Sequence, residues 1–281
     1  VTDLPEAASF GAMQLEGWDE YPWAATHTPS TTRLLVRQGI LSPQLRNYRD
    51  LLVAVPPGGL ESGRRYPVVY LQDGQNLFDA SSSYVEPWGL LEVMDRLAEA
   101  GTEALVVGIP NLGRLRRYEY SPFRDILHGG GGGDRYLAFL VETVKPLIDR
   151  DFPTDPSPVS TVLGGASLGG LISLYGAFRY PELFGAALIQ SPALWFAGAA
   201  IFPWLTDRPR PARIHLDIGT AEGAEALRDA RRLRDLLLDQ GAELGRDLSY
   251  QEEAGGDHHE VTWARRFETA LPFLLDGRGT P

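Results

Sequence analysis

Short runs of apolar residues, each bounded by turn-forming residues, recur along the chain. They cover residues 51–55, 67–71, 104–109, 159–163, 186–190 and 214–218. Their hydrophobicity is continuous rather than alternating, which is typical of strands that are covered on both faces in a mostly parallel sheet. We therefore predict a central sheet in which these runs are the buried strands.

Apolar residues at helical spacing occupy the intervals between these runs. Such stripes lie within residues 88–97, 136–147, 171–178, 226–237 and 263–274, and Gly241 provides a helix stop after residue 237. We interpret the stripes as core packing rather than as cofactor sites. The alternation of strands and helices predicts a doubly wound, mostly parallel α/β sheet with right-handed crossovers.

The N-terminal part of the chain has a different pattern. Residues 33–41 and 48–55 are joined by a short polar turn, so we predict an antiparallel hairpin that opens the sheet. Residues 1–30 are expected to form an irregular arm. No linker interrupts the remainder, and we expect one α/β domain over residues 31–281.

Composition and charge narrow the range of functions. The 281 residues include 37 acidic and 26 basic side chains, a net charge of −11, and no cysteine. The negative charge argues against a nucleic-acid partner, and the lack of cysteine excludes thiol chemistry and cysteine metal sites. We find no apolar stretch of membrane-spanning length and no secretory signal. We therefore expect no membrane partner and a cytoplasmic protein, with a signal peptide removed before Val1 as the alternative.

A run of glycines covers residues 129–133. Glycine loses more backbone entropy on folding than any other residue, so we predict a flexible surface loop here. A phosphate-binding loop would need a strand before the glycines, and the preceding Leu127 and His128 do not form a convincing one.

The most informative segment for chemistry is the pattern Gly165-x-Ser167-x-Gly169. It lies between a predicted strand and a predicted helix, which is the context of a nucleophile elbow. The turn is so tight that side chains two residues before and after the serine would collide, so glycines are needed there. The serine then lies above the sheet edge at a helix N-terminus, where partial positive charge favours an oxyanion.

An elbow serine needs an acid and a histidine base, which follow it along the chain in that order. Of the 5 histidines, two precede Ser167 and a third, His215, lies inside a predicted strand. His258 and His259 remain, in the loop before the last predicted helix. This loop is where such a histidine is expected.

The candidate acid is Glu222. It lies just beyond the 214–218 run, where its carboxylate can reach an imidazole. Asp217 lies within the run and is expected to pack or to form hydrogen bonds. Glu225 and Asp229 fall in the following helical stripe and are expected to be solvated.

The oxyanion hole requires a second N–H from the loop after an earlier strand. The 67–71 run leads into such a loop, where Gly74 lets the chain turn. The N–H of Gln75 can then point at the developing charge alongside that of Leu168. Asp73 is expected to anchor this loop by hydrogen bonds.

Several motifs occur in order between residues 41 and 275. Besides the elbow, they are Asp73-Gly74-Gln75-Asn76-Leu77-Phe78-Asp79, Ser191-Pro192-Ala193-Leu194-Trp195, Gly219-Thr220-Ala221-Glu222, and His258 five residues before Trp263. Together they resemble the putative-esterase branch of the α/β-hydrolases, which is related to enterochelin esterases, S-formylglutathione hydrolases, feruloyl esterases and mycobacterial mycolyltransferases.

The resemblance implies an α/β-hydrolase fold and a set of site residues. It selects His258 as the base, with His259 as a neighbour, and it places the acid at Glu222. The family's oxyanion amides fall at Gln75 and Leu168. This chain departs from the pattern at residue 72, where glutamine replaces the histidine that relatives often carry, and we expect this to alter the pocket floor.

We therefore predict a serine carboxylic-ester hydrolase that works through an acyl-enzyme. Its partner is a small-molecule ester, and its chemistry needs no metal and no cofactor. Two alternatives keep the fold, namely an acyltransferase on the same triad and a non-catalytic binding protein. A metal site within residues 257–260 is disfavoured, because consecutive side chains point in different directions.

The substrate pocket is less well specified by the sequence. Trp195, Phe196 and Trp88 are candidates to line it, with core packing as the other interpretation. The loop after residue 109 lies near the carboxyl edge of the sheet, where ligands bind in open α/β folds. Its arginines either hold an anionic substrate, such as a catecholate siderophore lactone, or form surface salt bridges. They are Arg114, Arg116, Arg117 and Arg124. Siderophore lactones, acylated sugars and simple esters all stay open.

Overall fold

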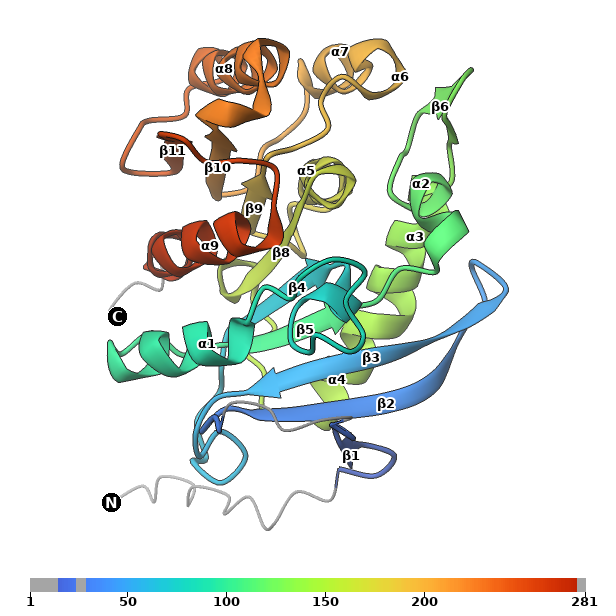
Figure 1. Ribbon diagram of the computed structural model, residues 1–281, viewed down its shortest axis with the longest axis vertical. Coiled ribbons are helices and arrows are strands. Elements are labelled where there is room, and N and C mark those ends of the chain that lie inside the picture. The colour runs from blue at the N-terminus through green and yellow to red at the C-terminus, as the bar shows by residue number, and fades with distance from the viewer. Residues whose placement is uncertain (1–14, 24–28, 277–281) are drawn as a thin grey trace, which may run out of the picture.

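A nine-stranded sheet runs through the computed structural model, which describes residues 15–23 and 29–276 (Figure 1). The strand order is β1-β2-β3-β5-β4-β8-β9-β10-β11. The strands are β1 (Asp19–Glu20), β2 (Arg33–Ser42), β3 (Asn47–Val55), β4 (Val68–Gln72), β5 (Leu105–Ile109), β8 (Thr161–Ala166), β9 (Ala186–Gln190), β10 (Arg213–Gly219) and β11 (Leu248–Glu253).

The larger part of this sheet is parallel. β5, β4, β8, β9, β10 and β11 run in the same direction, whereas β1, β2 and β3 pair antiparallel. β4, β5, β8 and β9 are buried along their whole length, as their continuous apolar sequences predict. The predicted parallel sheet and its antiparallel N-terminal hairpin are confirmed.

Helices cover both faces of the sheet (Figure 1). α1 (Leu90–Glu99) and α9 (Glu260–Leu275) pack in one apolar cluster, and α3 (Gly133–Phe139), α5 (Leu168–Arg179) and α8 (Ala224–Asp239) pack in another. Successive strand residues belong to different clusters, Leu52 to the first and Val53 to the second. This alternation is expected for a sheet that is covered on both faces.

Shorter helices complete the two layers. A π-helical turn (Leu140–Val144) connects α3 to α4 (Lys145–Asp151). The others are α2 (Arg116–Glu119), α6 (Phe196–Ala199) and α7 (Ile201–Leu205). No helix within the described ranges is both long and apolar enough to cross a membrane.

The described part of the N-terminal arm contacts the sheet. β1 pairs with β2, and the buried Trp18 packs against Phe152 and donates its indole N–H to Asp151 at 2.9 Å. The structure therefore adds an edge strand to a segment that was expected to be irregular. The rest of the 1–30 prediction, apart from residues 29 and 30, lies outside the described residues.

The glycine run differs from the flexible loop that the sequence predicts. Residues 129 and 130 form β7 (Gly129–Gly130), which pairs antiparallel with β6 (Arg124–Asp125). Gly130 has a φ of 90°. A Cβ on Gly132 would lie 2.3 Å from the Tyr118 ring. Glycine is therefore needed at these positions because the backbone is left-handed or packs closely against a neighbour. The run forms the second strand of a short hairpin and leads into the first turn of α3.

Candidate active site

Ser167 joins the end of β8 to the first turn of α5. Its φ of 60° and ψ of −124° are unusual for a residue with a side chain and store strain. Its N–H donates to the carbonyl of Gln190, and its own carbonyl accepts the N–H of Ala193, each at 3.0 Å. These hydrogen bonds hold the elbow at the carboxyl edge of the sheet, as the sequence pattern predicts.

Close contacts explain the glycines beside Ser167. A Cβ on Gly165 would lie 2.9 Å from both Gln72 Cγ and the carbonyl carbon of Gly169. A Cβ on Gly169 would lie 2.9 Å from Gln72 Cβ. Gln72 is 1% exposed beneath the elbow, where it accepts a hydrogen bond from Tyr136 and donates one to Ser173. The predicted collision is confirmed, and Gln72 supports the elbow from the core.

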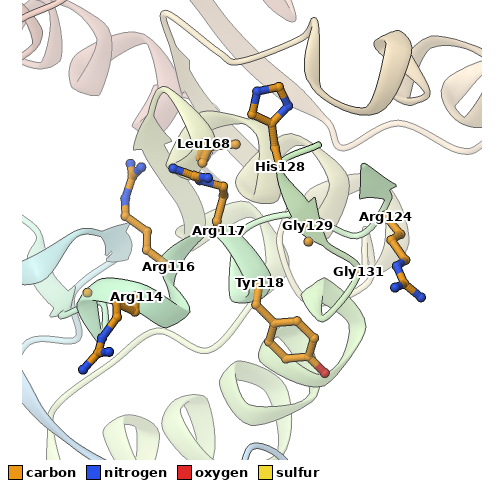
Figure 2. A pocket seen from close by; sticks show the side chains of 11 residues that line it. Arg114, Arg116, Arg117, Tyr118, Arg124, His128, Gly129, Gly131 and Leu168 are labelled. Atoms are coloured by element: carbon orange, nitrogen blue, oxygen red, sulfur yellow. The ribbon is translucent and has the colours of Figure 1, made fainter. Parts of the chain in front are cut away.

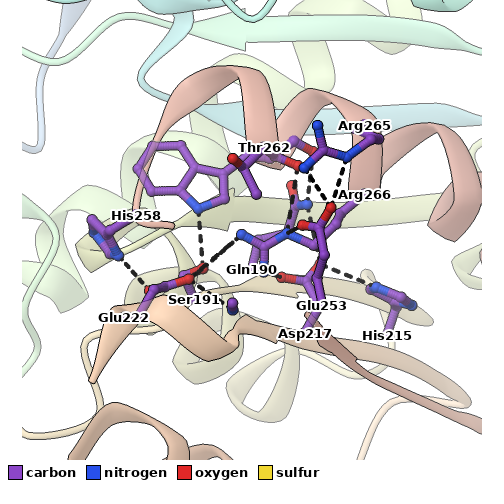
Figure 3. Close-up of polar contacts among 12 residues, drawn as sticks. Gln190, Ser191, His215, Asp217, Glu222, Glu253, His258, Thr262, Arg265 and Arg266 are labelled. Carbon is purple, nitrogen blue, oxygen red and sulfur yellow. Dashed lines mark hydrogen bonds and ion pairs between the residues drawn. The ribbon is translucent and has the colours of Figure 1, made fainter. Parts of the chain in front are cut away.

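The candidate acid and base are hydrogen-bonded to each other (Figure 3). His258 Nδ1 lies 2.7 Å from Glu222 Oε2. Glu222 ends the 3₁₀ turn Thr220–Glu222 after β10, and His258 lies in the loop between β11 and α9. The His258 side chain is 47% exposed and the Glu222 side chain only 3%. The pair therefore presents the ring to solvent and keeps the carboxylate inside.

Hydrogen bonds keep the Glu222 carboxylate ionised. Its Oε1 accepts the hydroxyl of Ser191 at 2.5 Å and the N–H of Gly219 at 2.9 Å. Burial raises the pKa of Glu222, but the hydrogen bonds from His258, Ser191 and the Gly219 N–H outweigh it, so the pKa lies below its ordinary value. An ionised Glu222 accepts a proton from His258 Nδ1, and in the neutral imidazole with that tautomer Nε2 is the acceptor nitrogen.

The neighbours of His258 face other partners. Asp257 accepts the hydroxyl of a threonine in α9 at 2.7 Å, and Glu260 accepts Nδ2 of Asn76 at 3.2 Å. His259 is the residue before α9, and its carbonyl accepts N–H groups of the first helical turn. Within the described ranges, no group of three or more His, Asp and Glu side chains is arranged to hold a metal ion.

The predicted oxyanion donors lie on neighbouring strand-to-helix connections. Leu168 is the first residue of α5, so its N–H is among the first-turn amides that lack an intrahelical acceptor. Gln75 lies in the 3₁₀ turn Gly74–Asn76 after β4, and its side-chain oxygen accepts the N–H of Asn111 at 3.0 Å. Because β4 and β8 are adjacent and parallel, both amides belong to the same edge of the sheet.

The turn into the Gln75 loop is made by Asp73 and not, as the sequence predicts, by Gly74. Asp73 has the left-handed φ of 58°. A Cβ on Gly74 would lie 2.5 Å from the carbonyl carbon of Gly108, so glycine is needed there for its close approach to β5. Arg116 binds both Asp73 oxygens, at 2.8 and 2.7 Å, and Asn111 Nδ2 donates to Oδ1 at 2.7 Å. The expected anchoring of the loop through Asp73 is confirmed.

A basic cavity of about 880 Å³ lies beside the elbow (Figure 2). Arg116 is bound to Asp73, whereas the other arginines that line the cavity have no carboxylate within salt-bridge distance among the described residues. Figure 2 shows Arg117 directed toward Leu168. The lining residues are Gly113, Arg114, Arg116, Arg117, Tyr118, Arg124, His128, Gly129, Gly130, Gly131 and Leu168.

None of the predicted pocket aromatics is among the residues that line this cavity, and Trp195 is the exposed one beside it. Trp195 is 53% exposed, and its ring centroid lies 5.4 Å from that of His128, a lining residue. Phe196 is 1% exposed and Trp88 is 5% exposed, and both belong to core clusters. Trp88 packs against Trp263, with centroids 5.8 Å apart. The core-packing interpretation therefore holds for Phe196 and Trp88.

β9 connects the elbow to the acid. The carbonyl of Gln190, its last residue, accepts the Ser167 N–H, and the next residue, Ser191, donates its hydroxyl to Glu222. Among the described residues, the ring of His258 has one side-chain hydrogen bond, to Glu222, and the Ser167 hydroxyl has none. Hydrogen bonds between a nucleophile and its base often tighten only when substrate is bound.

Sequence reasoning missed several residues that hold the site together. Ser191 and Asn76 lie in recognised motifs, but the sequence assigns neither of them a partner. Arg266 is 1% exposed and follows Trp263 by three positions on the buried stripe of α9. A charged residue on an apolar helix stripe was the available signal.

The chain is similar in sequence to known proteins. A family model described as "Putative esterase" matches residues 42–274. The chain is 29% identical over 252 residues to the uncharacterised protein YbbA of Bacillus subtilis, covering 84% of this chain and 96% of that protein. It is 28% identical over 159 residues to a siderophore enterobactin esterase of Emericella nidulans, covering 51% of each. The chain thus matches about half the length of this fungal relative.

Solved structures agree on the fold. The siderophore hydrolase EstB from Aspergillus nidulans matches with a TM-score of 0.68 at 22% identity, over 92% of this chain and 99% of that one. The enterobactin esterase FES from Shigella flexneri matches with a TM-score of 0.67 at 20% identity, over 90% of this chain and 60% of that one. With the family match over most of its length, the chain has the α/β-hydrolase-like fold of these structures, belongs to the putative esterase family and is an esterase that hydrolyses carboxylic esters.

Proposed function

We propose that this esterase works through an acyl-enzyme on Ser167, with His258 as base and Glu222 as acid. The observation that carries the proposal is the 2.7 Å hydrogen bond between His258 Nδ1 and Glu222 Oε2, downstream of a strained elbow serine. It leaves His258 Nε2 free to accept a proton, as the chemistry requires.

The proposed reaction has two halves. Ser167 Oγ attacks the ester carbonyl carbon while His258 Nε2 takes its proton, and the N–H groups of Gln75 and Leu168 stabilise the oxyanion. The tetrahedral intermediate then breaks its bond to the leaving alcohol, which receives the proton from His258. Water repeats the sequence on the acyl-enzyme, so the acid is released and Ser167 regains its proton.

The basic cavity supports an anionic ester as substrate. Arg114, Arg117 and Arg124 line it without a carboxylate partner among the described residues, although the chain carries a net charge of −11. Arginines that lack a carboxylate partner on an otherwise acidic protein indicate that the cavity binds an anionic ligand. The named relatives that act on siderophores make a catecholate siderophore lactone the first substrate to assay.

Labelling with a fluorophosphonate probe tests the nucleophile without a guess at the substrate. These probes react with activated serines, so the adduct is expected on the peptide that contains Ser167 and is expected to be lost in His258→Ala. Folded protein that shows no adduct, or an adduct on another serine, would overturn the assignment. A panel of siderophore lactones, acylated sugars and p-nitrophenyl esters then ranks substrates by kcat/KM.

A further inference from the structure

A buried polar cluster lies behind the candidate acid, on the side away from His258 (Figure 3). Ser191 is 2% exposed, Asp217 is 0% and Arg266 is 1%. Arg266 Nη1 donates to Asp217 Oδ1 at 2.7 Å, and its Nη2 donates to the Ser191 hydroxyl oxygen at 3.1 Å. The same Nη2 lies 3.5 Å from Glu222 Oε1.

The proton of the Ser191 hydroxyl has only one direction available. Its oxygen accepts the indole N–H of Trp263 at 3.0 Å and the guanidinium N–H of Arg266 at 3.1 Å. Indole and guanidinium groups donate and do not accept, and a hydroxyl has one proton and two lone pairs. Because both lone pairs are occupied, the proton points at Glu222 Oε1, 2.5 Å away.

The backbone of Ser191 is also held in an unfavourable conformation. Its φ of 41° is left-handed, although the residue carries a side chain. The N–H of Ser191 donates to the carbonyl of Asp217 at 2.9 Å, which fixes this conformation. Strain at a residue other than glycine persists only where the surroundings impose it. Here the backbone places the Ser191 hydroxyl between its donors, Trp263 and Arg266, and its acceptor, Glu222.

We propose that Ser191 and Arg266 are positioning residues for the reaction: they lock Glu222 Oε1 so that Oε2 meets His258 Nδ1. This inference rests on the proposed triad. Each of the donors to Glu222 points at one oxygen of its carboxylate, so the carboxylate has only one orientation. Catalysis requires that a side chain of the active site is held in such a fixed geometry. The other charged groups around Arg266 are Glu253, 3.3 Å from its Nε, and Arg265, which binds Glu253.

Ser191→Ala is the sharper variant, because loss of Arg266 would leave Asp217 buried without its cation and would threaten folding. The matched control is Ser160→Ala. Ser160 is also fully buried and donates its hydroxyl to a carboxylate, Asp155 Oδ2 at 2.6 Å, at the opposite end of β8. Both variants delete the same kind of hydrogen bond, but only one of them touches Glu222.

The experiment is a double-mutant cycle on kcat for p-nitrophenyl acetate, with KM measured alongside. Ser191→Ala is expected to lower kcat at least tenfold with little change in KM, and Ser160→Ala to stay within twofold of wild type. In a Glu222→Ala background, Ser191→Ala is expected to change kcat less than threefold. The downfield proton resonance of His258 Nδ1 is expected to shift in Ser191→Ala.

The outcomes separate this inference from the triad itself. Equal losses from Ser191→Ala in both backgrounds would indicate a general structural role and overturn the inference. A large loss from Glu222→Ala with none from Ser191→Ala would do the same while leaving the triad intact. Wild-type activity in Glu222→Ala would instead contradict the proposed function.

Discussion

Asn76 Nδ2 donates a hydrogen bond of 3.2 Å to Glu260 Oε1, and it thereby ties the loop that carries Gln75 to the first turn of α9. The two residues are 184 positions apart in the chain. Gln75 precedes Asn76, and His258 lies two residues before Glu260. The proposed oxyanion hole and the proposed base are therefore connected through one buried contact.

Asn76→Ala is expected to lower both the stability of the protein and its activity. Glu260 loses a buried partner, so the free energy of unfolding should fall by about 1–3 kcal/mol. The freed loop should also lower kcat/KM roughly tenfold, since a 1.4 kcal/mol change in the barrier has that effect. Urea unfolding and p-nitrophenyl acetate hydrolysis measure the two effects. A destabilised variant with unchanged kcat would show that the contact serves the fold alone.

The two adjacent histidines are expected to differ sharply. His258→Ala removes the base and should lower kcat on the order of 10⁴-fold or more, as loss of a triad member does. His259→Ala should stay within threefold, because that residue contributes a backbone carbonyl to α9. Steady-state rates of the two purified variants show which histidine is the base. Comparable losses would reopen the choice of base.

The arginines of the cavity are expected to separate by role. Arg117→Ala should raise KM for an anionic ester roughly tenfold, since hydrogen bonds to charged groups are worth about 1.5–3 kcal/mol, and leave neutral esters unchanged. Arg116→Ala removes the anchor of Asp73 and should lower kcat for both substrates. Paired assays with an anionic and a neutral ester at low and high salt distinguish them. Equal effects of Arg117→Ala on the two substrates would argue against an anion site.

The stability of the protein should depend on pH through Glu222. Its pKa in the folded protein lies below its ordinary value of 4.5. A group with a lowered folded pKa contributes stability that is present above the unfolded pKa and is lost as the pH falls through the folded pKa. Glu222→Gln should therefore be less stable than wild type at pH 7, and the difference should shrink below pH 4.5. Urea unfolding at a series of pH values measures it, and a difference that grows on acidification would contradict this assignment.

The strained backbone at Ser167 predicts that two substitutions with the same effect on activity differ in stability. Ser167→Gly and Ser167→Ala should both abolish turnover. Glycine tolerates positive φ, so Ser167→Gly should be more stable than Ser167→Ala by about 1 kcal/mol. Thermal or urea unfolding of the two variants gives the comparison, and equal stabilities would mean that the backbone at 167 is not strained.

The sequence predicted the parts of the fold that depend on local pattern. Continuous apolar runs located the buried strands, and the Gly-x-Ser-x-Gly turn located the elbow. β11 was missed, because this edge strand has the polar sequence LSYQEE and is mostly half-buried. The order of the motifs also predicted that Glu222 and His258 would meet, because parallel strands bring their carboxyl ends to one edge.

Sequence patterns do not predict polar contacts between residues that are far apart in the chain. Nothing local indicates that Arg116 binds Asp73 whereas Arg117 has no carboxylate partner among the described residues, since both lie in one short arginine cluster. The same holds for Arg266 and Ser191, which are 75 residues apart. Such pairs depend on how the helices dock on the sheet, which apolar spacing specifies only coarsely.

The proposed reaction requires that Ser167 carries an acyl group during turnover. The most direct test is mass spectrometry of protein quenched during hydrolysis of a p-nitrophenyl ester, followed by peptide mapping. An acyl adduct is expected on the peptide that contains Ser167, and it should be absent in Ser167→Ala, which also loses turnover. Continued hydrolysis by Ser167→Ala, or an adduct on a different residue, would contradict it.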